Sequence, residues 1–188
     1  MDALDLLLNR VSVPRLGDPA PAADQLDLMF RAALRAPDHG QLRPWRFLTI
    51  AGEARQALGE LFADAVRQRD PAAAEAQAKA RNMPLRAPLL VAIIARLQAH
   101  PKVPESEQLL AAGCAAHGLL LAAQALGFGG IWRSGELAFD PHVATGLGLA
   151  ADERLLGFIY LGTPEGRLRS APQLDPLDFV SSWPPRQQ

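Results

Sequence analysis

The apolar run PLLVAIIA at residues 88–95 is the clearest indication of the fold of this 188-residue chain. Seven consecutive apolar residues after a proline are typical of a strand that is covered on both faces. We therefore expect a central strand at residues 89–95, in a sheet that carries helices on both sides.

The segments around this strand alternate between helical and extended patterns. Apolar spacing and capping signals predict helices and three further strands, so the expected class is α+β, an α/β sandwich. The chain length fits one domain, residues 1–188. Its Pro-rich tail, about residues 164–188, is either a loose terminus or an arm that lies on a partner. The expected helices span 2–9, 22–35, 53–69, 72–82 and 105–126, with one more starting at Asp140-Pro141, and the strands span 45–50, 129–132 and 155–161.

The longest expected helix, residues 105–126, is apolar nearly all round and needs cover on every side. Gly113, His117, Gly118 and Gln124 interrupt it, which favours burial in protein over lipid. Its Cys114 is the one cysteine of the chain, which excludes an internal disulfide, and we expect it to be buried. The start MDALDLLLNR does not resemble a secretion signal, so a cytoplasmic location is expected.

Composition and motifs exclude several classes of function. Apolar residues make up 49% and the net charge is −1, so neither nucleic acid nor an anionic membrane is an expected partner. The glycines at 127–130 and 146–148 do not complete a dinucleotide fingerprint, and no phosphate loop is present. The four histidines are spaced too far apart for a helical metal pair, so no metal site is expected.

Three short polar clusters remain, each at the end of a regular element. The first, Arg10-Val11-Ser12, could bind an anion such as a phosphate or could be a solvated loop capped by Ser12. The second joins Arg35 to the turn around His39, and the third follows the glycines at 127–130. Taken alone, the second and third are explained by turn chemistry.

In combination, four motifs resemble the nitroreductase family of FMN flavoproteins, and most of all its small bacterial NAD(P)H nitroreductase subgroup. They are Arg-x-Ser after the first helix, APDHGQLRPWRF at 36–47, GFGGIWRSG at 127–135 and GFIYLGTP at 157–164. The resemblance covers the chain from residue 1 to about 164. It implies a nitroreductase-like fold, a mixed and mainly antiparallel sheet flanked by helices, in an intertwined homodimer whose helices 105–126 bury each other.

The resemblance also implies two FMN molecules at the subunit interface. The backbone at residues 129–130 would lie against the flavin ring, and Trp132 would form an aromatic wall. The flavin would pass hydride from NAD(P)H to a nitroaromatic or quinone in a ping-pong order, so no catalytic side chain is expected. The implied FMN contacts are Arg10, Val11, Ser12, Trp132, Arg133 and Ser134 from one subunit, with Arg35 and His39 from the other.

Some contacts and some functions stay open at this point. Gln41 stands where many relatives carry an Asn near the flavin, and Arg167 and Arg169 could hold the phosphate although their spacing is not diagnostic. A flavin carrier or sensor of the same fold would not turn over. A helical interaction module that dimerises through residues 105–126 would bind no cofactor.

Overall fold

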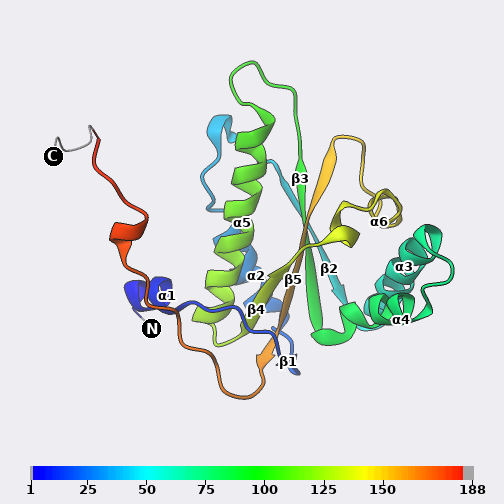
Figure 1. Ribbon diagram of the computed structural model, residues 1–188. Coiled ribbons are helices and arrows are strands. Elements are labelled where there is room, and N and C mark those ends of the chain that lie inside the picture. The colour runs from blue at the N-terminus through cyan, green and yellow to red at the C-terminus, as the bar shows by residue number, and fades with distance from the viewer. Residues whose placement is uncertain (1, 184–188) are drawn as a thin grey trace.

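The structure, a computed structural model, describes residues 2–183. Met1 and residues 184–188, which belong to the expected domain and to its C-terminal arm, lie outside this part. The described residues form six α-helices, four 3₁₀ helices and five strands (Figure 1). In chain order these elements are α1 (Ala3–Asn9), β1 (Leu16–Gly17), α2 (Ala23–Ala33), η1 (His39–Gln41), β2 (Trp45–Ala51), α3 (Glu53–Arg69), α4 (Ala74–Asn82), η2 (Met83–Arg86), β3 (Leu89–Arg96), α5 (Glu105–Ala125), β4 (Gly129–Arg133), η3 (Glu136–Phe139), α6 (Pro141–Gly146), β5 (Glu153–Pro164) and η4 (Pro176–Asp178).

The expected helices and strands are confirmed, α6 begins at Pro141 as expected, and the other bounds differ by at most two residues except at the end of β5, which lies three residues later. The sheet gains the short strand β1. β3 lies between β2 and β5, as its apolar run predicts, and β4 and β1 pair with the other edge of β5. Every pairing among the described strands is antiparallel, so this part of the sheet is not mixed. Because β3 and β4 both run antiparallel to β5, they run parallel to each other on its two edges, and α5 makes the crossover between them.

The two faces of the sheet pack against different helices. Val91 and Ile93 of β3 face a core built with α2 and α5, while Leu90 and Ile94 face a second core built with α3 and α6. Figure 1 shows α2 and α5 on one side of the strands and α3, α4 and α6 on the other. Because successive side chains of a strand point to opposite faces, an unbroken apolar run serves both cores.

One side of α5 is covered and the other is open in the single chain. α5 is long and apolar enough to cross a membrane, yet it packs as a core helix against α2 and the sheet. Leu110, Cys114 and His117 lie on its exposed side, with Leu110 68% exposed. The expected burial of Cys114 is therefore wrong for the single chain, because no element among residues 2–183 covers that side.

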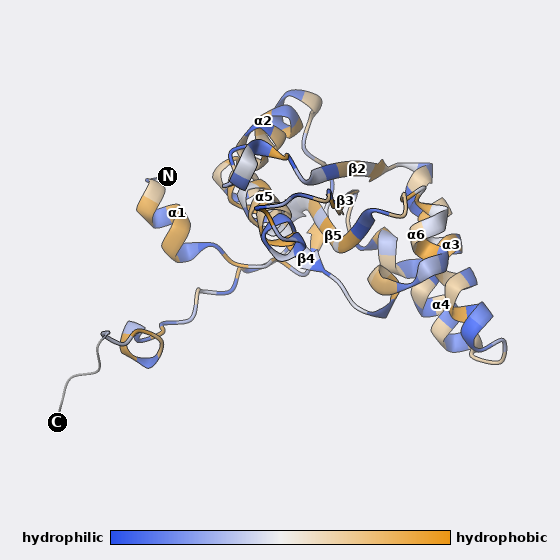
Figure 2. Cartoon of the chain, turned by 90° about the horizontal axis from the view of Figure 1, so that it is seen from above, coloured by the Kyte–Doolittle hydropathy of each residue, from blue (hydrophilic) through white to orange (hydrophobic). Residues whose placement is uncertain are grey.

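α1 and the C-terminal segment, as far as residue 183, extend away from this body (Figure 2). α1 contributes no buried residue, and three of its leucines are exposed. In the C-terminal segment Leu177, Phe179 and Trp183 are exposed, Trp183 by 91%. Apolar side chains in extended segments without cover indicate that these segments bind another surface.

Candidate functional site

The loop that follows α1 lies beside β4. The amide of Val13 donates to the Gly130 carbonyl at 3.0 Å. Gln124 near the end of α5 accepts a hydrogen bond from the Val11 amide at 3.1 Å and donates to the Asn9 carbonyl at 3.3 Å. The fold therefore brings the first and third clusters together and fixes the loop that carries Arg10, Val11 and Ser12.

The glycines at the start of β4 pack closely within the chain. A Cβ atom at Gly129 would lie 2.7 Å from Leu16 and 3.0 Å from Val13, and one at Gly130 would lie 2.7 Å from Leu120. Both glycines are buried against side chains of their own chain. The side of each glycine that a Cβ would occupy is filled by packing within the chain, and a flavin ring against this stretch of backbone stays a prediction.

A cavity of about 230 Å³ lies between this loop and the segment after β5. Ser12 and Arg15 line one side, and Arg167 and Arg169 line the other. Glu165 is the one carboxylate in the lining, and its amide donates to the Arg15 carbonyl at 3.1 Å. Three guanidinium groups and a hydroxyl around so small a space suit a phosphate group. The structure thus places Arg167 and Arg169, which the sequence left open, beside Ser12.

Trp132 and Arg133 point to opposite sides of β4. The Trp132 indole Nε1 donates to the Leu156 carbonyl at 3.1 Å, and its ring lies next to Gly113 of α5. Arg133 lies over the Tyr160 ring, with Cζ 5.6 Å from the ring centroid. Its Nε is buried and has no hydrogen-bond partner among residues 2–183. A buried donor without a partner is uncommon in folded proteins, which sets Arg133 apart from the other charged side chains at this end of β4.

A second cavity, about 530 Å³, opens at this end of β4. Arg133 and Ser134 line it together with Lys79 of α4, Arg86 of η2 and Tyr160 of β5. Sequence reasoning missed the last three as site residues, because they lie in no motif and only the fold brings them together. Burial raises the pKa of Tyr160, and the charges of Arg133 and Arg86 oppose that effect, so its hydroxyl is a neutral donor at neutral pH.

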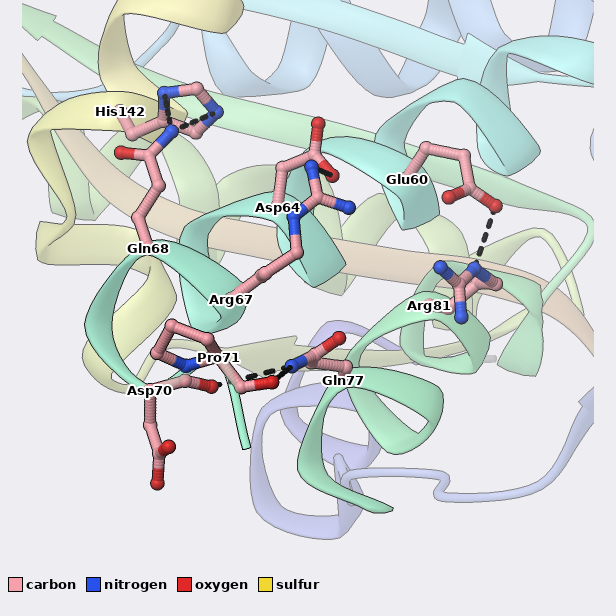
Figure 3. Close-up of polar contacts among 9 residues, drawn as sticks. All are labelled: Glu60, Asp64, Arg67, Gln68, Asp70, Pro71, Gln77, Arg81 and His142. Atoms are coloured by element: carbon pink, nitrogen blue, oxygen red, sulfur yellow. Dashed lines mark hydrogen bonds and ion pairs between the residues drawn. The ribbon is translucent and has the colours of Figure 1, made fainter. Parts of the chain in front are cut away.

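The α3–α4 hairpin forms one wall of this cavity and is held by polar contacts (Figure 3). Arg81 Nε donates to Glu60 Oε1 at 2.7 Å. Gln77 Nε2 donates to the carbonyls of Asp70 and Pro71, at 3.3 and 3.1 Å. At the crossing, Gly59 allows the two helices to approach, because a Cβ there would overlap the Arg81 carbonyl. The hairpin therefore fixes the positions of Lys79 and of η2.

The second cluster, Arg35 with the turn around His39, lies apart from these two cavities. Arg35 and Gln41 line a separate cavity of about 350 Å³ beside β2, and the single chain brings neither Arg35 nor His39 into the lining of the other two. His39 Nδ1 lies 2.7 Å from Glu107 Oε2 of α5. A contribution of Arg35 and His39 to a site at β4 thus needs a second copy of the chain, and it stays a prediction.

Backbone strain marks the turn that carries this cluster. Gln41 and Arg43 have φ of 52° and 49°, in the left-handed region that non-glycine residues rarely adopt. The Asp38 carboxylate stabilises the turn by accepting from the amides of Leu42 at 3.1 Å and Arg43 at 2.8 Å. Strain of this kind persists where surrounding contacts hold it, often in binding segments.

Comparison with solved structures defines the class of fold. A nitroreductase-like family protein from Bacillus cereus superposes with a TM-score of 0.84 at 21% identity, covering 98% of this chain and 97% of that one. A variant of the FMN and NADPH-dependent nitroreductase NfnB from Sphigopyxis sp. strain HMH gives 0.77 at 18% identity, covering 98% and 100%. These likenesses establish the nitroreductase-like α+β fold.

Sequence comparison defines the family. The profile of the Nitroreductase family matches residues 7–163. The chain is 44% identical over 185 residues to the Escherichia coli (strain K12) protein named "Putative NAD(P)H nitroreductase YdjA", covering 96% of this chain and 99% of that protein. The chain belongs to the nitroreductase family, and its activity is that of an oxidoreductase.

Proposed function

We propose that this chain is an FMN-dependent oxidoreductase that uses NAD(P)H to reduce nitroaromatics, quinones or similar acceptors. The observation that carries the proposal is the pair of features at the two ends of β4. The cationic cavity of Ser12, Arg15, Arg167 and Arg169 lies at one end, and the unpartnered buried Nε of Arg133 lies at the other. The FMN and NADPH named for NfnB, and the NAD(P)H named for YdjA, support FMN as the cofactor and NAD(P)H as the donor.

The described residues fit FMN at both of its ends. Arg167, Arg169 and Ser12 would bind the phosphate by charge-assisted hydrogen bonds, with Arg15 beside them. Val11, Trp132, Arg133 and Ser134 would hold the ring and its chain, and Arg10 would add charge from the end of α1. Since β4 is five residues long, it separates the two ends by roughly 13 Å, which suits an elongated mononucleotide.

Bound FMN supplies a ring that takes hydride from NAD(P)H and delivers it to an acceptor in the same place, which gives a ping-pong order. Per nitro group converted to a nitroso group and water, one NAD(P)H and one solvent proton are consumed. The residues of the chain bind and orient, and the positive charge of Arg133 favours the electron-rich reduced ring. No side chain is required as a general acid or base.

We propose further that the protein is an intertwined homodimer. The open side of α5 with Leu110, the exposed leucines of α1 and the apolar C-terminal segment support this, because exposed apolar side chains gathered on such elements mark interaction surfaces. A second copy would cover α5 and would bring its own Arg35 and His39 to the flavin. The expected location is the cytoplasm, where NAD(P)H is supplied and Cys114 stays reduced.

The visible spectrum of the purified protein tests the proposal. We expect a yellow protein that NADPH bleaches without oxygen and that a quinone or nitroaromatic then recolours. A flavin carrier or sensor of the same fold would be yellow but would not bleach. A colourless protein that takes up no FMN would contradict both and would favour a cofactor-free interaction module.

A further inference from the structure

The 530 Å³ cavity at the end of β4 combines an aromatic floor with a cationic wall. Phe62 and Phe158 are buried and pack edge to face, with ring centroids 5.4 Å apart and an interplanar angle of 72°. Tyr160 lies beside them in the lining. Aromatic side chains in this arrangement offer a surface on which a flat ring can pack.

The charges around the cavity are unbalanced. Four cations line it, Arg69, Lys79, Arg86 and Arg133, against one carboxylate, Glu136. Arg69 is already paired, at 3.0 Å with Glu136 and at 3.5 Å with Asp140. Within residues 2–183 no carboxylate oxygen lies within 4.0 Å of a side-chain nitrogen of the other three cations. Three positive charges therefore face the cavity without a partner from the described chain.

The three cations differ in their burial. Arg133 is half-buried and held over the Tyr160 ring, so it lies on the side of the cavity assigned to FMN. Lys79 and Arg86 are exposed on α4 and η2, on the opposite wall, which the proposed FMN contacts do not use. The α3–α4 contacts drawn in Figure 3 hold that wall in place. A ligand between the two walls meets the aromatic floor and the free cations together.

We propose that this cavity takes electron acceptors that carry an anionic group, such as a carboxylate, on an aromatic ring, and that Lys79 and Arg86 select them by charge. The inference rests on the proposed function, because it names the substrate class of the same site. The Tyr160 hydroxyl adds a neutral donor to the same anion. A nitrobenzoate or a carboxylated quinone fits this description, and its neutral analogue lacks the charged contact.

Binding of unreactive analogues tests the charge preference without turnover. Calorimetric titration of the FMN-loaded protein with benzoate and with benzamide should give tighter binding of benzoate, by roughly three- to tenfold, since the cations are partly exposed. Arg86→Ala and Lys79→Gln should each abolish most of this difference, and Arg86→Lys should retain part of it. Lys102→Gln, which changes the other lysine of the chain, should leave it intact.

Steady-state kinetics with NADH as the donor provide the second measurement. Arg86→Ala should raise KM for 4-nitrobenzoate about three- to tenfold more than KM for 4-nitrotoluene. Lys102→Gln should leave both KM values unchanged, because Lys102 does not line the cavity. Equal affinities for benzoate and benzamide would overturn the proposal. Loss of FMN from Arg86→Ala would also overturn it, because Arg86 would then bind the flavin. A changed preference between NADPH and NADH, with an unchanged acceptor preference, would overturn it too, because Arg86 would then bind a nucleotide phosphate.

Failure of the proposed function would give a different result from failure of the charge preference. A protein that holds no FMN, or that NADH does not bleach, contradicts the oxidoreductase assignment, and the benzoate and benzamide titrations can still be made on it. A protein that is reduced by NADH and reoxidised equally well by both nitro compounds contradicts the charge preference alone.

Discussion

At the scale of single residues, Glu153 joins three strands through its carboxylate. Arg46 of β2 donates to both of its oxygens, at 2.7 Å through Nε and 2.6 Å through Nη2, and the Ala150 amide donates at 3.1 Å. Arg96 of β3 lies 3.8 Å away. The hydrogen bonds from Arg46 hold the pKa of Glu153 below its ordinary 4.5, despite burial, and the same pair raises the pKa of Arg46.

The lowered pKa of Glu153 makes the stability of the fold depend on pH. A carboxyl whose pKa is lowered by folding stabilises the fold above its ordinary pKa, and that contribution is lost as the pH falls below about 4.5. Glu153→Gln should lower the free energy of unfolding by about 2 kcal/mol at neutral pH, less than for a fully buried pair because Arg46 is 29% exposed. Urea unfolding near neutral pH and at about pH 3 measures both effects.

A matched variant separates this pair from charge effects in general. Glu60→Gln breaks the exposed pair with Arg81 and should leave the free energy of unfolding nearly unchanged. The Glu153 assignment fails if Glu153→Gln keeps the full acid sensitivity of the wild type.

At the scale of elements, α5 fixes two loops through two glutamines. Gln108 is 1% exposed, accepts from the Gln98 amide at 2.9 Å and donates to the Gln98 carbonyl at 2.8 Å. Gln98 in turn donates to the Leu42 carbonyl at 2.9 Å, in the strained turn. At the other end of α5, Gln124 holds the Arg10–Ser12 loop. Sequence reasoning counted Gln124 only as an interruption of an apolar helix.

Gln124→Ala should therefore weaken FMN binding while the fold stays intact. Two hydrogen bonds to the loop are lost, so retention of FMN should drop by about five- to thirtyfold, at roughly 1 kcal/mol per bond. Fluorescence titration of the apoprotein with FMN measures the affinity, and far-ultraviolet circular dichroism follows the fold. Gln77→Ala on α4 removes two comparable bonds away from the loop and should leave FMN affinity unchanged. Equal FMN affinities of Gln124→Ala and the wild type would mean that the two hydrogen bonds of Gln124 do not position the FMN site.

For the molecule as a whole, the separation of Arg10, which follows α1, from Arg35, which lines the cavity beside β2, leads to a complementation test. Arg10→Ala and Arg35→Ala should each weaken FMN binding in a homodimer. In a mixed dimer of the two variants, one site would lack both arginines and the other would keep both, if each site takes Arg10 from one subunit and Arg35 from its partner.

Mixed dimers should therefore recover about half of the wild-type FMN sites with wild-type affinity. Differently tagged subunits, purified in tandem and titrated with FMN, provide the measurement. Recovery of no wild-type site would mean that both arginines serve the same subunit, and a monomer in sedimentation analysis would contradict the proposed dimer itself.

Sequence patterns alone predicted the helices, the strands and the family. Local signals sufficed, because apolar periodicity, Pro37, Gly127 and the Asp140 cap act over a few residues, and Asp140 indeed accepts from the His142 amide at 2.8 Å. Four motifs in order were enough to identify the family.

The contacts between these residues became clear only in the folded chain. The fold filled the space at Gly129 with Val13 and Leu16, turned Trp132 toward α5, and left Cys114 on an open face. It also joined Arg167 and Arg169 to Ser12, and Lys79 and Arg86 to Tyr160. These contacts link residues far apart in the chain, so they depend on how strands pair and helices pack, which local sequence does not encode.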